Sequence, residues 1–235
     1  MADASTLFSD EVRERVAEAV KSAESRTAAE IVCAAATESG RYDRAEGICG
    51  LLGAVALLAL TNFYSVSDFS SAVASGDGVS QGWAAPASLG LFEQMLAICL
   101  GYVAGNLLAS YVHPLRRLLV SEREMDEEVA RAASRVFLTQ RMSATRGAGG
   151  VLVFVSLFER RVLVLADDGV MEHDGQALVE ATRDRAQDAL RSREYGDAFV
   201  AAVDEVAGRL EQALPIVSDD TDELPNELRV FHPRP

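Results

Sequence analysis

Residues 151–166 read VLVFVSLFERRVLVLA, in which two apolar runs flank a short polar break. The first run, Val151–Leu157, has the composition of a central strand that is covered on both faces. The second run, Val162–Ala166, follows directly after the polar triplet Glu159–Arg161. A break of this length between two apolar runs predicts an antiparallel hairpin within a sheet.

Helices and a further strand are predicted around this hairpin. Ser9 precedes two acids and an apolar stripe, and Ser121 with Glu124 forms an S-x-x-E capping box, so a helix is expected to begin after each serine. Ala29–Thr37 is apolar enough for a short buried strand. Apolar residues at helical spacing predict two further helices, Gln176–Arg191 and Asp197–Leu214. Strands that alternate with amphipathic helices predict an α/β fold, in which a small sheet is covered by helices as an α/β/α sandwich.

Residues 47–113 contain no Lys and no Arg, although the sequence on either side contains both. They hold two apolar runs, Gly47–Val66 and Leu89–His113, each long enough for the about 20 residues with which a helix crosses a bilayer. We therefore expect a two-helix transmembrane hairpin that interrupts the α/β domain. The expected segments are 1–46 and 114–214 as the two parts of the soluble α/β domain, 47–113 as the transmembrane hairpin, and 215–235 as an acidic C-terminal tail.

Basic residues lie just outside the two apolar runs and are missing between them. Arg41 and Arg44 precede the first run, Arg116 and Arg117 follow the second, and the polar connector Ser67–Ser88 has no base. By the positive-inside rule, both termini and the soluble domain are then cytoplasmic, and the connector is on the opposite side. The sequence thus predicts an integral membrane protein with two spans in the lipid bilayer.

Small residues recur every four positions in the second apolar run, at Ala97, Gly101, Gly105 and Ala109. Rows of this kind let helix backbones approach closely in lipid. We expect the row to pack the two helices of the hairpin together. The alternative is a homo-oligomer formed through Gly101 and Gly105.

The charge and motif content narrow the possible functions. A formal net charge of −14 would repel a phosphate backbone, which argues against nucleic acid as a partner. The sequence contains no G-x-S-x-G, P-loop or dinucleotide fingerprint, so we assign no catalytic and no cofactor-binding residue. His173 with Asp174 would suit acid–base chemistry, and Arg160 with Arg161 would suit a phosphate. Exposed loop positions explain both pairs more simply.

Three stretches together resemble the TPM-domain family, which includes thylakoid lumen proteins and many bacterial membrane proteins. The most specific is Gly150–Val170, GVLVFVSLFERRVLVLADDGV, with its apolar strand, E-R-R turn and second strand closed by Ala-Asp-x-Gly-Val. The other two are Thr27–Val32, TAAEIV, and Asp219–Glu227, DDTDELPNE. This chain departs from the commonest family arrangement, because its membrane segment is internal rather than terminal.

The resemblance implies a compact α/β/α sandwich attached to a membrane, and some relatives are described as binding divalent metal. Carried over to this chain, the metal-associated acid is Asp167, with Asp168 beside it, and the cation is Ca²⁺ or another divalent metal. A strand end is expected to expose such a carboxylate without burying it. Glu30 and the acids of 219–223 are further possible ligands. Ordinary turn chemistry also explains an Asp-Asp-Gly sequence.

Two functions fit these expectations. The first is a membrane-anchored, non-enzymatic TPM-like module that binds membrane protein partners and a divalent metal, and assists the assembly or upkeep of membrane complexes. The second, which the resemblance implies because some relatives are described as acid phosphatases, is a metal-dependent acid phosphatase at the membrane surface. The absence of a clear nucleophile, base or phosphate cradle in the sequence favours the first.

Overall fold

The computed structural model describes residues 3–74, 90–142, 149–173, 175–192, 194–216 and 224–235, and the side chains of these residues other than 65–74, 113 and 115. Most of the expected connector, Ser67–Ser88, lies outside the described residues. Internal contacts divide the chain into two compact units. The α/β unit comprises Met1–Gly40 and Ser121–Pro235, and the helical unit comprises Arg41–Val120.

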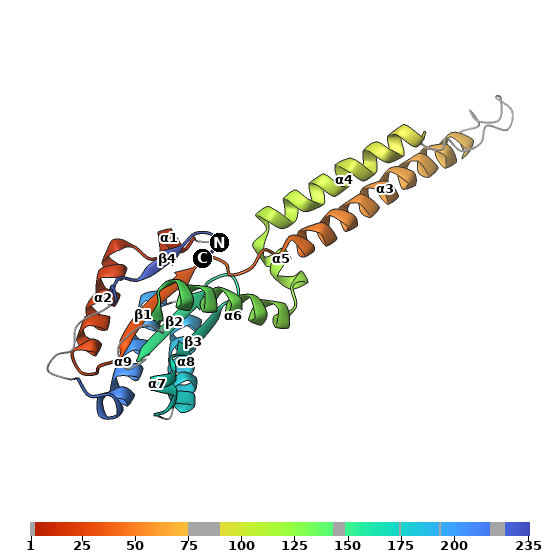
Figure 1. Ribbon diagram of the computed structural model, residues 1–235. Helices are drawn as coiled ribbons and strands as arrows, with labels where there is room; N and C mark the ends of the chain where they lie inside the picture. The colour runs from red at the N-terminus through yellow and green to blue at the C-terminus, as the bar shows by residue number, and fades with distance from the viewer. Residues whose placement is uncertain (1–2, 75–89, 143–148, 174, 193, 217–223) are drawn as a thin grey trace. The chain divides into compact units, whose positions relative to one another are not determined.

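The α/β unit is built from strands and helices of both parts of the chain (Figure 1). Its strands are β1 (Glu30–Ala36), β2 (Gly150–Ser156), β3 (Arg161–Ala166) and β4 (Arg229–Phe231). Its helices are α1 (Ala4–Leu7), α2 (Asp10–Glu24), α6 (Glu122–Thr139), α7 (Asp168–Met171), α8 (Gly175–Arg191) and α9 (Tyr195–Ala213). The mixed α/β class predicted from the sequence is therefore confirmed.

The sheet has the strand order β3-β2-β1-β4. The strands β2 and β3 pair antiparallel with Val153 opposite Val164, which confirms the predicted hairpin. The strand β1 pairs parallel with β2, with Cys33 opposite Val153. Parallel neighbours need a long crossover between them, and here the crossover contains the entire helical unit and α6.

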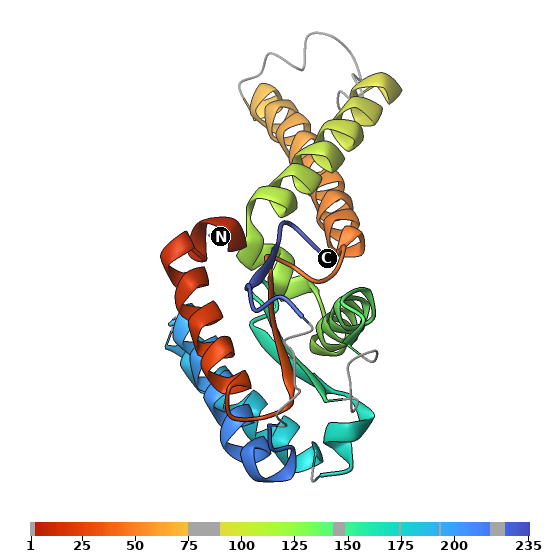
Figure 2. The ribbon, with the colours of Figure 1, turned by 60° about the vertical axis from the view of Figure 1, so that its left-hand side comes forward.

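Two apolar clusters cover the two faces of the sheet, and Figure 2 shows α2 and α9 on one side and α6 on the other. Alternate residues of β2 contribute to opposite clusters, since successive side chains of a strand point to opposite faces. Val151, Val153 and Val155 join the cluster with α2, α8 and α9, whereas Leu152 and Phe154 join the cluster with α6. This double cover explains why the β2 sequence is apolar at almost every position.

Local signals placed two helix starts correctly. The Ser9 hydroxyl accepts a hydrogen bond from the Val12 N–H at 3.4 Å at the start of α2. The Ser121 hydroxyl accepts one from the Glu124 N–H at 3.2 Å at the start of α6. Both contacts lie within one helical turn, so the sequence spacing alone was enough to find them.

Residues 215–235 were expected to be an acidic C-terminal tail, and part of this segment is instead a strand of the sheet. β4 pairs parallel with β1, with Ala35 opposite Val230. The pairing covers the β1 edge that would otherwise be open, because unpaired strand edges leave backbone donors and acceptors unsatisfied. Three residues carry too little periodicity to mark a strand in the sequence.

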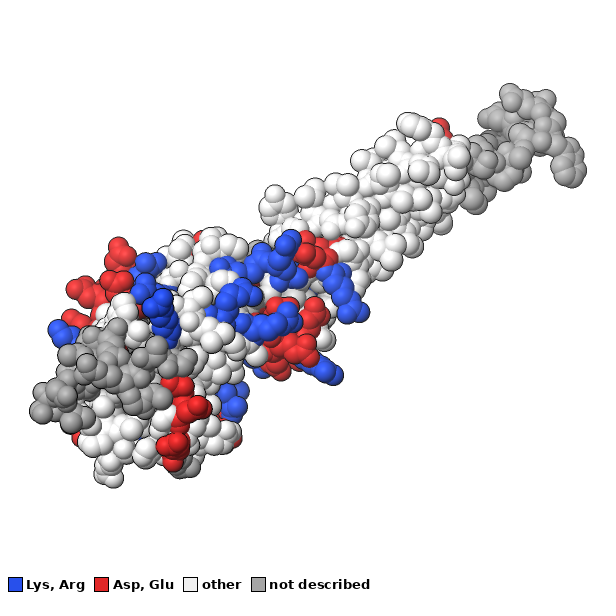
Figure 3. Space-filling view, in the orientation of Figure 1, with Lys and Arg blue, Asp and Glu red and all other residues white. Residues whose placement is uncertain are grey.

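The helical unit contains α3 (Asp43–Ala74), α4 (Leu91–Tyr111) and α5 (His113–Leu119). By length and composition, Asp43–Tyr64 and Leu91–Tyr111 are able to cross a membrane. Only 17% of the most apolar 18 residues of each helix is buried, whereas a core helix of a soluble protein would be mostly buried. Figure 3 accordingly shows the surface of these helices as almost free of charge. Large apolar side chains that face outward include Leu51, Leu52, Val55, Leu96, Leu100 and Val103.

The row of small residues on α4 packs against α3. Ala97, Gly101, Gly105 and Ala109 are the buried residues of α4. A Cβ atom at Gly101 would collide with the backbone oxygen of Gly53, and one at Gly105 with that of Cys49. The two helices therefore meet backbone to backbone, which is the packing that the sequence favoured over a homo-oligomer face.

Candidate functional site

Asp167 is the first residue after β3, at the end of the sheet where β2 begins. Its backbone N–H donates to the Gly150 oxygen at 2.9 Å, so the strand ladder continues to this residue. The residue is only 9% exposed, and its Oδ2 atom makes no hydrogen bond with the described residues. The expectation of an exposed carboxylate is therefore wrong. The Met142 backbone packs over Gly150, the strand residue beside Asp167.

Asp168 is placed differently from its neighbour. It is exposed and is the first residue of α7. Asp167 occupies the N-cap position of this helix, but its side chain makes no capping hydrogen bond. The two aspartates thus have separate surroundings. Of the two, only Asp167 is buried, and its Oδ2 accepts no hydrogen bond from the part of the chain that the structure describes.

Glu30 lies at the same end of the sheet as Asp167. It is opposite Gly150 in the β1–β2 register, and the Gly150 oxygen in turn accepts from Asp167. Two strand spacings separate the Glu30 and Asp167 backbones by about 10 Å. Alternation along the strands directs both side chains to the α6 face, the face of Val32 and Leu165. Glu30 is 8% exposed, and its Oε2 accepts a hydrogen bond from the Leu224 N–H at 3.3 Å.

A backbone oxygen lies over Gly150, the residue of β2 that stands between Glu30 and Asp167 in the sheet. A Cβ atom placed on Gly150 would come within 2.9 Å of the Met142 carbonyl oxygen. Glycine is therefore required at 150, because a side chain would displace the Met142 backbone. We call the Glu30 carboxylate, the Met142 carbonyl and the Asp167 carboxylate the oxygen row.

The oxygen row has the chemistry of a site for a hard cation. A buried carboxylate is costly unless it is paired or coordinates a metal, and Ca²⁺ takes carboxylate and backbone carbonyl oxygens in a shell of about 6–8 ligands. Within the described part of the chain, no group of three or more His, Cys, Asp or Glu side chains is suited to a metal ion. A cation here would therefore use the Met142 carbonyl oxygen and water besides the two carboxylates.

The sequence did not single out Met142, because a carbonyl ligand does not depend on residue type. The only local signal was Gly150, the first residue of β2. The acids of 219–223, expected as further ligands, lie outside the described residues, as does Asp174.

The remaining reactive side chains do not join the oxygen row. His173 is exposed, and its Nδ1 lies 2.9 Å from the Gly169 oxygen. Burial raises the pKa of the Cys33 thiol, and the negative charge of Glu24 adds to this, so the thiol stays protonated. A protonated thiol is a poor nucleophile and a poor metal ligand. Arg161 is paired with Glu122 and with Asp126, the latter at 3.0 Å.

Comparison with known proteins supports the family resemblance over the centre of the chain. Residues 111–209 match the TPM domain family. This range contains the β2–β3 hairpin with Asp167 and Asp168, while Glu30 and the C-terminal motif lie outside it. The central part of the chain is therefore similar to a TPM domain.

A solved structure has a similar fold. It is the NMR structure of the BA42 protein from the psychrophilic bacterium Bizionia argentinensis, with a TM-score of 0.54 and 14% sequence identity. The alignment covers 95% of this chain and 94% of that protein. At this level of identity the likeness concerns the fold alone. No curated protein matches the sequence.

Proposed function

We propose that this protein is a membrane-anchored, non-enzymatic TPM-like module that binds membrane protein partners and a divalent cation in the assembly or upkeep of membrane complexes. The observation that carries the proposal is the insertion of two long, outwardly apolar helices into an α/β unit with a TPM domain. A surface of this kind is unfavourable in water and favourable in lipid.

Membrane anchoring is supported by charge as well as by hydrophobicity. Arginines flank the two helices at Arg41, Arg44, Arg116 and Arg117, and Arg116 is fixed by Glu46 at 3.5 Å and by the Tyr42 ring at 5.6 Å. Moving such charges across a bilayer is costly, so they stay on the cytoplasmic side. Both termini and the α/β unit are then cytoplasmic.

The topology is testable by labelling single cysteines with a membrane-impermeant maleimide, in a variant without Cys33, Cys49 and Cys99. Ser75→Cys in the connector should react in intact cells, because the connector faces away from the cytoplasm. Glu211→Cys on the exposed side of α9 should react only after the membrane is opened. Labelling of Ser75→Cys only in opened membranes would contradict the proposed orientation.

Cation binding is supported by the oxygen row and by the lack of a hydrogen bond to Asp167 Oδ2 among the described residues. Without a cation, Asp167 is a buried acid whose Oδ2 atom has no hydrogen bond from the described residues, which is costly. A bound cation would offset this cost. It would also hold in place the end of the sheet where the Met142 backbone lies over Gly150.

Millimolar Ca²⁺ is expected to raise the melting temperature of the full chain in nonionic detergent. A ligand that binds only the folded state stabilises it by about 2.7 kcal/mol at 100 times its Kd. Asp167→Asn should remove most of this increase without lowering the metal-free melting temperature, because the substitution removes a buried charge. The exposed Asp204→Asn should retain the full response. Equal Ca²⁺ responses in both variants would mean that Ca²⁺ acts by diffuse screening of surface charge. Asp167 would then be an ordinary turn residue.

The same variants separate this function from the phosphatase alternative. Hydrolysis of 4-nitrophenyl phosphate that requires a divalent cation and is lost in Asp167→Asn would favour the enzyme.

A homo-oligomer through Gly101 and Gly105 would have to form at residues already packed against α3. Its formation would appear as chemical cross-links between copies that a Gly105→Leu substitution abolishes.

A further inference from the structure

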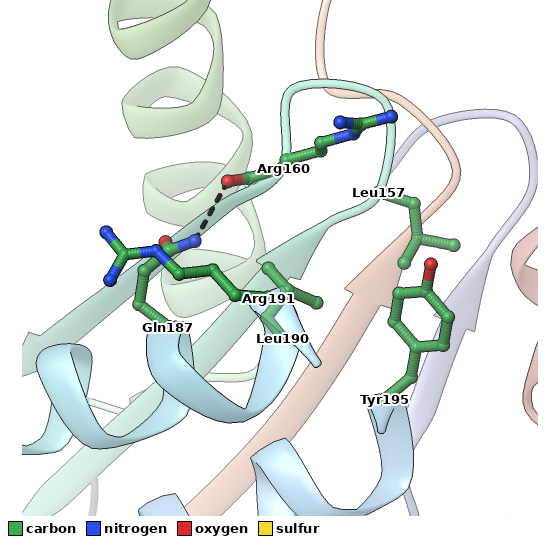
Figure 4. A pocket seen from close by; sticks show the side chains of 6 residues that line it. All are labelled: Leu157, Arg160, Gln187, Leu190, Arg191 and Tyr195. Atoms are coloured by element: carbon green, nitrogen blue, oxygen red, sulfur yellow. Dashed lines mark hydrogen bonds between the residues drawn. The ribbon is translucent and has the colours of Figure 1, made fainter. Parts of the chain in front are cut away.

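The α/β unit has a hollow of about 240 Å³ beside the turn between β2 and β3, lined by Leu157, Arg160, Gln187, Leu190, Arg191 and Tyr195. The Gln187 side-chain amide donates to the Arg160 backbone oxygen at 3.2 Å and thereby holds the turn against α8 (Figure 4). Figure 4 also shows the guanidinium groups of Arg160 and Arg191 pointing to opposite sides. The polar groups of this hollow therefore do not converge on a ligand, and the more informative polar groups lie in the helical unit.

Polar side chains form one outward side of the apolar helix α4, next to the small residues that contact α3. Cys99, Tyr102, Asn106 and Ser110 are three or four residues apart in turn, so they share one face of the helix. Cys99 and Ser110 are exposed, Tyr102 is 46% exposed, and Asn106 is half-buried. We call these four residues the polar face of α4.

The neighbouring helix α3 makes room for the polar face but does not satisfy it. A Cβ atom at Gly50 would collide with the Asn106 side-chain nitrogen and with the Tyr102 ring, so both side chains lie against the α3 backbone. The Asn106 Nδ2 donates to the Tyr102 backbone oxygen of α4 itself, at 3.3 Å. Among the described residues, the Asn106 Oδ1 and the Tyr102 hydroxyl have no hydrogen-bond partner.

These two groups lie deep within the apolar helix. Asn106 is five residues before the end of α4 at Tyr111, which is about 8 Å along the helix axis. Tyr102 is next to the middle residue of α4. Because α4 is about as long as the hydrocarbon core is thick, at about 30 Å, both side chains fall inside the core when the helix spans a bilayer. A polar group without a hydrogen bond is costly at that depth, so a further helix that supplies one is favoured.

The geometry favours a second copy of this chain as the source of that helix. Two copies inserted with the same topology place Asn106 at the same depth, and each amide has both an acceptor oxygen and donor hydrogens. A symmetric contact then lets the Oδ1 of each Asn106 accept from the Nδ2 of the other. Glu93 is the one charged residue in the sequence of α4 and lies near its far end, so like charges do not keep the copies apart.

We propose that this protein forms a parallel homodimer in the membrane through the polar face of α4, with the two Asn106 side chains hydrogen-bonded to each other. Asparagine side chains form such hydrogen bonds between membrane helices. The row with Gly101 and Gly105 stays packed against α3, so this contact is distinct from a homo-oligomer through that row. The inference rests on the proposed membrane anchoring and goes beyond it by naming the partner and the surface.

Cys99 allows a direct test, because its thiol is exposed on the polar face. In a variant with Cys33→Ala and Cys49→Ala, Cys99 is the remaining thiol. The full chain in phosphatidylcholine vesicles should form a disulfide-linked dimer when iodine, a lipid-soluble oxidant, is added. The control is Leu100→Cys with Cys99→Ala, which moves the thiol about 100° around the helix at almost the same depth and should give little dimer. Leu100 is itself 55% exposed, so access of the oxidant is matched.

The strength of association is measured by energy transfer between donor-labelled and acceptor-labelled copies in the same vesicles, over a range of protein-to-lipid ratios. The label is placed at Glu211→Cys in a variant without the native cysteines. Asn106→Leu should weaken association about tenfold, because both hydrogen bonds are lost while the side chain keeps nearly the same size. Asn106→Gln, which keeps an amide, should retain most of it. The matched control Asn62→Leu should associate normally, because Asn62 is two residues from the end of its apolar span at Tyr64 and reaches water.

The outcomes decide between the possible partners. A monomer at every protein-to-lipid ratio would overturn the proposal, as would equal association of Asn106→Leu and the unchanged protein, or equal cross-linking through residues 99 and 100. Cross-linking of Cys99 to another membrane protein in cells, without a dimer in vesicles, would overturn the assignment to a second copy. Labelling of Ser75→Cys tests membrane insertion separately, so a correctly inserted monomer would refute the dimer and leave the anchoring intact.

Discussion

Phe154→Ala is expected to lower the free energy of unfolding of the α/β unit by about 3–5 kcal/mol. Phe154 lies in the central strand β2, is completely buried, and packs in the cluster between the sheet and α6. Removal of its ring forfeits the burial of a large apolar side chain and leaves a cavity, because the β2 backbone is fixed by strands on both sides. Urea-induced unfolding of the full chain in nonionic detergent measures the change.

Leu138→Ala is the matched control for this experiment. Leu138 is on α6 but is 68% exposed, so its truncation should change the free energy of unfolding by less than about 0.5 kcal/mol. A loss below about 1.5 kcal/mol for Phe154→Ala would mean that α6 does not pack on the sheet as described.

Glu159→Ala is expected to lower the same free energy by about 2–4 kcal/mol. Glu159 is completely buried in the turn between β2 and β3. It accepts hydrogen bonds from the Ser39 N–H at 2.9 Å and from the Ser156 hydroxyl, and that hydroxyl accepts from the Ser39 hydroxyl at 2.7 Å. Alanine would leave these donors buried without an acceptor, and each unsatisfied donor costs about 1–3 kcal/mol.

The amide hydrogen of Ser39 gives a local measure of this loss. Its exchange with solvent should accelerate strongly in Glu159→Ala and much less in Glu159→Gln, because glutamine keeps an oxygen acceptor for the Ser39 N–H. Unchanged exchange in the alanine variant would show that the turn is not held through this residue.

The sequence by itself determined the elements whose signals are local. The capping serines at 9 and 121, the apolar β2 strand and the helical spacing of Phe199, Val203 and Val206 all lie within a few residues of the structure they specify. The absence of Lys and Arg over 47–113 likewise marked the two apolar helices. In each case the pattern of burial repeats along one element, so a window of the sequence contains the whole signal.

Only the tertiary structure decided which polar groups are buried and what they contact. The pairing of β4 with β1 joins residues almost 200 positions apart, the Met142 oxygen reaches Gly150 by close approach of backbones, and Gln187 meets Arg160 across 27 residues. The same is true of Glu159, whose partner Ser39 is 120 residues away. Whether a charged side chain is exposed or buried depends on which distant segment packs over it, and a residue's own neighbours in sequence do not carry that information.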